Sequence, residues 1–135
     1  MSSPARARKR PTPTPHNGVY VRLGASPLHG VGVFAIRAIG KGVNPFRHDN
    51  TTMVWVPVEK LRRLPADIRK LYEDFGVLQR GRYGVPRSFN QLTPAWYLNN
   101  SSSPNMRCGK GYNFFALRHI RAGEELTIDY LTYSE

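Results

Sequence analysis

Gly123-Glu124-Glu125-Leu126-Thr127-Ile128-Asp129-Tyr130 is the stretch of this sequence that decides the fold. Gly123 predicts a turn, because glycine supplies backbone conformations that other residues avoid. The apolar residues that follow predict a last β-strand from Leu126 to Leu131. The stretch therefore indicates an extended C-terminal segment that carries a tyrosine, Tyr130, close to its end.

Two earlier segments stand out beside this one. The run Asn99-Asn100-Ser101 is followed by Pro104-Asn105, and His29-Gly30-Val31-Gly32 lies near the start of the chain. A Gly-x-Gly alone is a weak signal, since most such pairs are turns, and an asparagine alone most often satisfies a turn. These segments become informative about function only through their order and spacing relative to the C-terminal stretch.

The remaining pattern predicts a mainly β domain with a helical insert. Leu61, Leu64 and Ile68 begin a three- and four-residue periodicity that predicts a helix over 58–75, which Pro65 restarts. The Gly- and Pro-rich stretch 76–95 is typical of a loop-dominated insert. Turns are expected at Ser26-Pro27 and Gly40-Lys41-Gly42, and short strands are expected over 19–23, 31–36, 43–46, 112–117 and 126–131.

Size and composition favour one domain. The chain has 135 residues, with twenty Lys and Arg against nine Asp and Glu, and therefore a net charge of +11. Residues 1–17 are Pro-rich and basic and are expected to be a disordered tail, with the folded domain over 18–135. The single cysteine, Cys108, excludes an internal disulfide and indicates a reducing compartment. Because neither a secretion signal nor a membrane span is evident, we expect an intracellular protein.

Three segments together resemble the SET-domain family of protein lysine methyltransferases. The segment His29 to Ala35, with the turn Ile39-Gly40-Lys41-Gly42, is similar to the family's opening strand. Trp96 to Asn105 resembles its Asn-His-Ser box, and Phe115 to Tyr130 matches its closing motif almost residue for residue. The resemblance implies a fold of several small β-sheets in which the Asn-box segment and the final strand cross as a C-terminal pseudoknot. It also implies a small, stand-alone SET domain.

The resemblance implies S-adenosylmethionine as the cofactor. Gly30, Val31 and Gly32 would bring main-chain groups close to its amino and carboxylate ends. Asn99 offers both an amide donor and a carbonyl acceptor, which suits that zwitterionic end, and Asn100 would contact the cofactor beside it. No metal is implied, since His16, His29, His48 and His119 show no zinc-like spacing.

Tyr130 corresponds to the family's catalytic tyrosine, beside the path between cofactor and attacking amine, and would contact both. Methyl transfer needs alignment and a dry, electron-rich lining, which a phenol oxygen and main-chain carbonyls supply. Tyr97, Ile128 and Tyr133 are candidates for the lysine channel, although each could instead be core. Glu124 and Glu125 are interpreted as a solvated turn, because this chemistry uses no hydrolytic water.

This sequence departs from the family pattern at several positions. Asn100 stands where the family usually has histidine, and Ser102 stands where it usually has cysteine. Arg47-His48 replaces an acidic residue followed by an active-site tyrosine, so His48 either substitutes for that tyrosine in the channel or faces solvent. Few residues follow Tyr130, and a second subunit, in a homodimer, would then supply the missing wall. These departures leave a second reading open, a catalytically silent SET-like module that binds nucleic acid or protein.

The expected substrate is a lysine in a basic, DNA-associated or histone-like protein. A net charge of +11 repels such a partner unless acids such as Asp49, Glu73, Asp74, Glu124 or Asp129 line the groove. DNA held by residues 1–17 would bridge the two proteins. A cytoplasmic, nucleoid-associated or nuclear location is expected, with a role in chromatin.

Overall fold

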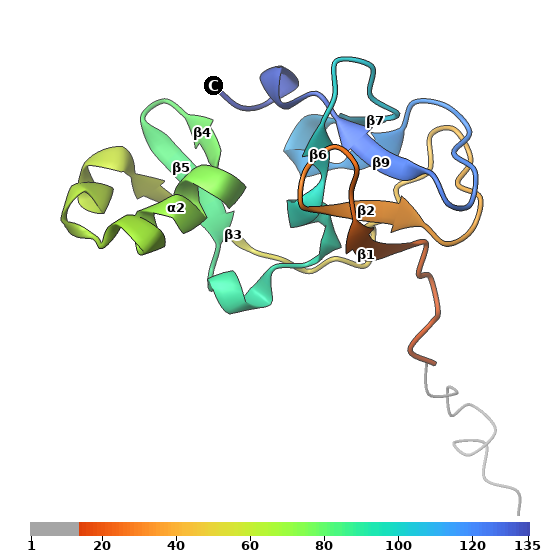
Figure 1. The fold of residues 1–135 in the computed structure, drawn as a ribbon, viewed down its shortest axis with the longest axis horizontal. Coiled ribbons are helices and arrows are strands. Elements are labelled where there is room, and N and C mark those ends of the chain that lie inside the picture. Colours follow the sequence, from red (N-terminus) through yellow and green to blue (C-terminus); the bar gives the residue numbers. More distant parts are fainter. Residues whose placement is uncertain (1–13) are drawn as a thin grey trace, which may run out of the picture.

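The largest sheet brings the three sequence segments side by side. A computed structural model describes residues 14–135, and this sheet has the strand order β1-β2-β9-β6 (Figure 1). β2 is antiparallel to β1 and to β9, whereas β6 is parallel to β9. The Gly-x-Gly, the closing motif and the asparagine box therefore occupy neighbouring strands. Their bounds are β1 Val21–Ala25, β2 Val31–Ala35, β6 Asn99–Asn100 and β9 Glu125–Ile128.

The core of the domain lies beneath this sheet. Val33 on β2, Leu126 and Ile128 on β9, and the bridged pair Ile39 and Ile120 have no exposed surface. Burying each such side chain contributes about 1.5–3 kcal/mol. Alternation along β9 places Leu126 and Ile128 in the core, which fixes the register of the strand. The mainly β fold with several small sheets is confirmed.

A second lobe is built from the insert (Figure 1). Its sheet has the order β3-β5-β4. The elements are β3 Met53–Pro57, the 3-10 helix Val58–Arg63, α2 Ala66–Phe75, β4 Val77–Gln79 and β5 Arg82–Pro86. The restart of the helix at Pro65 is confirmed, because Pro65 precedes α2 and Leu64 before it is extended, as proline requires.

The prediction of a loop-dominated insert over 76–95 is wrong. β4 and β5 form an antiparallel hairpin there, joined by Arg80 and Gly81 with φ of 52° and 74°. Positive φ at both loop residues is the geometry of a type I′ turn, which usually carries Asn-Gly or Asp-Gly. Arginine at the first of these positions hides the turn, and Gly84 and Pro86 make β5 look unlike a strand. After the hairpin come the 3-10 helices Phe89–Gln91 and Pro94–Tyr97.

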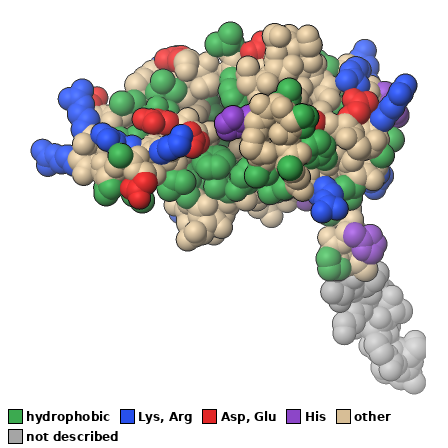
Figure 2. All heavy atoms as spheres, viewed as in Figure 1, with side chains coloured by type: hydrophobic (Ala, Val, Ile, Leu, Met, Phe, Trp, Pro, Cys, Tyr) green, Lys and Arg blue, Asp and Glu red, His purple; other side chains and the backbone are tan. Residues whose placement is uncertain are grey.

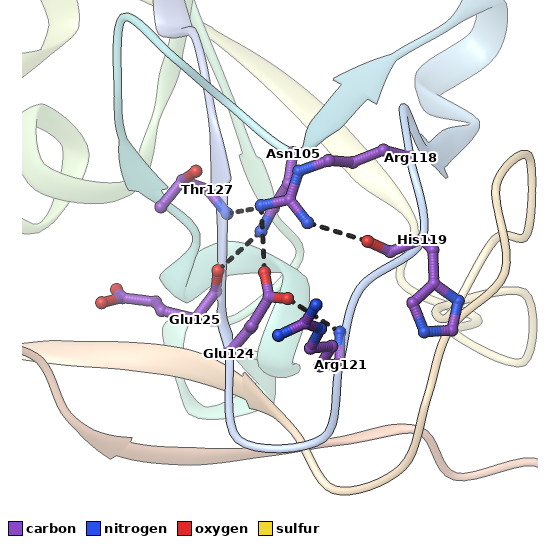
Figure 3. Close-up of polar contacts among 7 residues, drawn as sticks. All are labelled: Asn105, Arg118, His119, Arg121, Glu124, Glu125 and Thr127. Carbon is purple, nitrogen blue, oxygen red and sulfur yellow. Dashed lines mark hydrogen bonds and ion pairs between the residues drawn. The ribbon is translucent and has the colours of Figure 1, made fainter.

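A small hairpin and the clasp, our name for the two hydrogen bonds that join the Asn105 side chain to the main chain of β9, complete the core lobe. β7 Met106–Cys108 and β8 Phe114–Ala116 pair antiparallel across the 3-10 turn Lys110–Tyr112. Asn105, which is buried, donates from Nδ2 to the Glu125 carbonyl at 2.8 Å and accepts from the Thr127 amide at 2.8 Å (Figure 3). This side chain ties the Asn-box segment to the last strand at the C-terminal pseudoknot.

The last strand ends earlier than expected. β9 stops at Ile128, and the Asp129 carboxylate then accepts from the Leu131 amide and begins the 3-10 helix Tyr130–Thr132. The chain continues to the insert, where the Glu135 amide donates to the Leu78 carbonyl at 2.8 Å. The C-terminus therefore joins the two lobes along the edge strand β4.

The N-terminal end of the described chain is a turn. The Asn17 amide donates to the Thr14 carbonyl at 3.1 Å, and the Val19 amide donates to the His16 carbonyl at 3.2 Å. Residues 14–17 were expected to belong to the disordered tail, but these hydrogen bonds order them. The rest of that expected tail, residues 1–13, lies outside the described residues. No helix among residues 14–135 has the length and apolar character needed to cross a bilayer.

Candidate functional site

A cavity of about 700 Å³ lies between the core lobe and the insert. Leu98, Phe114, Tyr130 and Tyr133 line it from the core lobe, and residues of β3 and α2 line it from the insert. In the view of Figure 2, hydrophobic side chains gather across the middle of the molecule, and Lys and Arg lie mostly toward its two ends. The cavity combines aromatic walls with several acids, a lining that suits a ligand with both apolar and positively charged parts.

Tyr130 forms part of this wall. Its hydroxyl donates a hydrogen bond to the main-chain carbonyl of Leu98, the residue just before β6. Burial raises the pKa of the Tyr130 phenol above its ordinary value, so the hydroxyl stays protonated at neutral pH. A neutral phenol and a main-chain carbonyl thus place two oxygens side by side at the cavity wall.

An aromatic cluster surrounds this tyrosine. Tyr133 contacts Tyr130 edge to face at 6.3 Å, and it contacts Phe114 in the same way at 6.3 Å. Phe114 in turn meets Phe46 at 5.9 Å. Burial, together with the nearby Tyr130 phenol, raises the pKa of Tyr133 strongly. These rings keep water away from one side of the cavity and hold the Tyr130 ring in place.

Asn100 positions the main chain of Tyr130. Its side-chain Oδ1 accepts from the Tyr130 amide at 2.8 Å. The asparagine at this point of the family motif therefore has a clear structural role, because an acceptor is needed where the chain leaves β9 and begins the Tyr130–Thr132 helix. Asn100 is exposed and does not line the cavity.

The Gly-x-Gly lies on the other side of β9 from the insert and forms a second cluster. Asn99 is 7% exposed, and its Nδ2 donates to the carbonyls of His29 and Val31 and to Glu125 Oε2. Ser26 Oγ donates to the same carboxylate at 2.7 and 2.9 Å. One acidic side chain thus joins β6, β9 and the loop between β1 and β2.

The two glycines serve different purposes. Gly30 has a φ of 45°, and a Cβ there would meet nothing within 4 Å, so its backbone conformation alone favours glycine. A Cβ on Gly32 would lie 2.3 Å from Glu125 Oε2. The close approach expected at Gly32 is therefore to a carboxylate of the same chain. Val31 between them is 46% exposed, so a ligand can reach this part of β2.

The expected channel residues do not all reach the cavity. Tyr133 lines it, whereas Ile128 is fully buried in the core and Tyr97 packs on Phe75 at 5.3 Å. His48 is exposed and lies against Gly18, which places it outside the cavity and corresponds to the solvent alternative.

Glu124 and Glu125 behave differently, contrary to the expectation of a single solvated turn. The Glu124 carboxylate accepts from Arg118 at 3.0 Å, and this hydrogen bond is the main reason that its pKa is lowered. The Glu125 side chain points away from that of Glu124 (Figure 3), and its carboxylate accepts from Ser26 and Asn99. Sequence reasoning missed Glu125 because charge alone suggested solvent. Its place on β9 two residues before Thr127 was the available signal that it shares a strand face with the motif.

The charges at the cavity are mostly negative. Asp49, Glu73, Asp74 and Glu135 line it, with Arg47 as the one cation among the lining residues of the described chain. Three of these acids were expected in a substrate groove, whereas Glu124 and Asp129 lie elsewhere. Within residues 14–135, no three His, Cys, Asp or Glu side chains gather closely enough to hold a metal ion.

Comparison with known proteins gives one family and several related structures. The SET domain family model matches residues 30–131. The crystal structure of a Plasmodium falciparum protein assigned as a histone methyltransferase has a TM-score of 0.51 and 21% identity, over 83% of this chain and 93% of that one. A humanized mutant of the Chaetomium thermophilum Polycomb Repressive Complex 2, bound to an inhibitor, has a TM-score of 0.55 and 20% identity, over 86% of this chain and 15% of that one. No curated protein matches. At these identities the structures share the fold.

Proposed function

Because the chain belongs to the SET-domain family, we propose that it is an S-adenosylmethionine-dependent protein lysine N-methyltransferase. The observation that carries this proposal is the position of Tyr130. Its ring lines the cavity, its hydroxyl is bonded to the Leu98 carbonyl, and its main chain is held by Asn100 of the asparagine box. One residue thus links the cavity to the strands that carry the expected cofactor residues.

The residues around Gly30 and Asn99 fit the amino acid end of the cofactor. Val31 is exposed there, and the acceptors nearby, which also hold the Asn99 amide, include the Glu125 carboxylate and the His29 and Val31 carbonyls. Acceptors of this kind suit an ammonium group. When bound, S-adenosylmethionine supplies a methyl group on a positively charged sulfur.

The chain's own residues would prepare the substrate amine. A lysine amine has an ordinary pKa near 10.4, so the aromatic wall of Tyr130, Tyr133 and Phe114 favours the neutral form by excluding water. The proton then leaves to solvent through the open side of the cavity. The Tyr130 hydroxyl and the Leu98 carbonyl orient the amine and stabilise positive charge as it develops. Neither oxygen is consumed, which agrees with a phenol that stays protonated.

The charges of the cavity support a basic substrate segment. Glu73 and Asp74 on α2 and Asp49 before β3 line it, although the chain as a whole carries +11. Local acids of this kind attract Lys and Arg that flank a target lysine and offset the repulsion at longer range. The assignment of the Plasmodium relative as a histone methyltransferase agrees with a histone-like or DNA-associated substrate. Such a substrate places the protein in the nucleus or nucleoid.

The test compares two peptides that present the same lysine, one with basic and one with acidic flanking residues. Wild-type protein with radiolabelled S-adenosylmethionine should label the basic peptide preferentially. Tyr130→Phe keeps the ring contacts and removes the hydroxyl, so transfer should fall by about 100-fold while calorimetric binding of the cofactor persists. If wild type labels no lysine substrate and binds no cofactor, the protein is instead a catalytically silent SET-like module, the reading favoured by Asn100 and Ser102.

A further inference from the structure

Glu125 is a carboxylate without a cationic partner. Its oxygens accept from Ser26 Oγ at 2.7 and 2.9 Å and from Asn99 Nδ2 at 2.9 Å. Only two ion pairs occur among residues 14–135, and neither includes Glu125. A partly buried carboxylate that has only neutral donors gains strongly from a nearby cation.

The hydrogen bonds of Asn99 determine which way its amide faces. All three partners of Nδ2, the His29 and Val31 carbonyls and the Glu125 carboxylate, are pure acceptors. The NH2 group must therefore face them, and the amide cannot be turned over without placing oxygens against oxygens. Glu125 contributes the charged partner of the three.

The Asn99 oxygen remains available to a ligand. No donor among residues 14–135 contacts Oδ1, and no buried side-chain oxygen or nitrogen in that part of the chain lacks a partner. Oδ1 therefore reaches solvent although Asn99 is 7% exposed. The Glu125 carboxylate on the Nδ2 side of the same amide carries a negative charge that no cation pairs within residues 14–135, so this position favours a positively charged donor.

Glu125 also fixes the loop that borders this position. Ser26 Oγ accepts from the amides of Leu28 and His29 at 3.0 and 3.3 Å, and it donates to Glu125. Gly32 leaves the space that the carboxylate occupies, since a Cβ there would lie 2.3 Å from Oε2. Glycine at position 32 is therefore required for the Glu125 carboxylate to occupy this space.

We propose that Glu125 is a positioning residue, which holds the Asn99 amide with its oxygen open to the ligand and makes this end of the site selective for a primary ammonium group. The inference rests on the proposed function, because it assigns that ammonium to the methionine end of S-adenosylmethionine. Glu125 acts through Asn99 and through its charge, and it takes no part in the transfer itself.

The test measures the selectivity of binding by calorimetry with the full-length protein. The ligands are S-adenosylhomocysteine and the analogue in which hydrogen replaces its α-amino group. Wild type should bind the amine-bearing ligand at least about tenfold more tightly, as expected for charge-assisted hydrogen bonds. In Glu125→Gln this ratio should fall to about twofold or less, because glutamine has no charge and its amide can present either an oxygen or an NH2 to Asn99. Affinity for the deaminated analogue should stay near the wild-type value.

A control variant and separate outcomes distinguish failure of this inference from failure of the proposed function. Glu124→Gln removes a neighbouring carboxylate that is paired with Arg118 and should leave the ratio unchanged. Gly32→Ala, which displaces the Glu125 carboxylate, should lower the ratio as Glu125→Gln does. An unchanged ratio in Glu125→Gln, or an equal loss of both ligands, overturns the inference while the proposed function stands. If wild type binds neither ligand, the proposed function fails and the inference fails with it.

Discussion

At the scale of single residues, the site depends on side chains that hold other groups in place. Asn100 holds the Tyr130 amide, and Leu98 receives the Tyr130 hydroxyl. Both contacts come from the asparagine box and its preceding residue. The tyrosine is therefore placed by a segment some thirty residues earlier in the chain, and this long-range contact makes its position testable.

Substitution at Asn100 tests whether this side chain positions Tyr130. Asn100→Ala removes the acceptor of the Tyr130 amide, and kcat should fall by about ten- to a hundredfold because a small displacement of a positioned group is costly. Asn100→Asp keeps an acceptor oxygen and should stay within a few-fold of wild type. Steady-state kinetics on the basic peptide check both values. Equal activity of the alanine and aspartate variants would contradict the positioning role.

The thiol of Cys108 should react slowly in the folded protein. Burial raises its pKa from 9.0 to about 11. The thiolate is the reactive form, so at pH 8 its fraction falls by about 100-fold relative to the unfolded chain. Alkylation by iodoacetamide should show this difference between native and urea-unfolded protein, and the native rate should keep rising until about pH 11. A native rate that levels off near pH 9 would contradict the burial of this thiol.

At the scale of elements, the sequence predicted the strands that carry the motifs and the helical part of the insert, and it missed the strands of the insert. Val31 to Ile36 appears close to its expected bounds, and the final strand begins close to the expected residue but ends three residues early. β3 and the β4–β5 hairpin were missed because their pairing depends on Arg80 at positive φ and on contacts between distant segments. Glu125 was missed because its charge suggested solvent, and its contacts with Ser26 and Asn99 join segments that lie far apart in the sequence.

The hairpin loop offers a direct test of the insert. Gly81 has a φ of 74°, and a Cβ added there would meet open space, so Gly81→Ala should cost about 1–2 kcal/mol of unfolding free energy through backbone strain alone. Gly40→Ala is the matched control, because Gly40 has an ordinary φ and its nearest contact would be Val43 Cγ2 at 3.6 Å. Urea unfolding measures both. Equal stability of the two variants would show that the loop does not adopt this turn.

The clasp at Asn105 should contribute strongly to stability. Asn105→Ala leaves the Thr127 amide and the Glu125 carbonyl without partners in a buried position, which costs about 3 kcal/mol. The control is Asn90→Ala, at an exposed asparagine for which the structure shows no side-chain hydrogen bond within residues 14–135. Chemical denaturation should show a large loss for the first variant and almost none for the second. A loss below about 1 kcal/mol at Asn105 would mean that the crossing is held by other contacts.

At the scale of the whole molecule, negative charge is concentrated at the cavity, whereas the chain as a whole is positively charged. The chain carries +11, yet most charged groups that line the cavity are acids. In the view of Figure 2, Lys and Arg lie mostly toward the two ends of the molecule. We propose that polyanion contact and substrate contact use different parts of the chain, with DNA held by basic residues that include the N-terminal cluster.

Removal of residues 1–13 tests the contact with DNA. This segment contains Arg6, Arg8, Lys9 and Arg10, and its deletion leaves the turn at residues 14–17 intact. The slope of log affinity against log salt should become shallower by about 3 to 4, because each neutralised phosphate contributes about 0.9. A full-length variant with these four residues changed to glutamine should behave in the same way. An unchanged slope in both variants would remove residues 1–17 as the phosphate contact.

The most direct test of the central claim is a crystal structure with S-adenosylhomocysteine and a basic lysine peptide bound together. We expect the amino acid end of the cofactor product at Gly30, Val31 and Asn99, and the target lysine in the cavity beside Tyr133. The two ligands should meet beside the Tyr130 hydroxyl. A cofactor product bound elsewhere, or a Tyr130 hydroxyl remote from both ligands, would contradict the account.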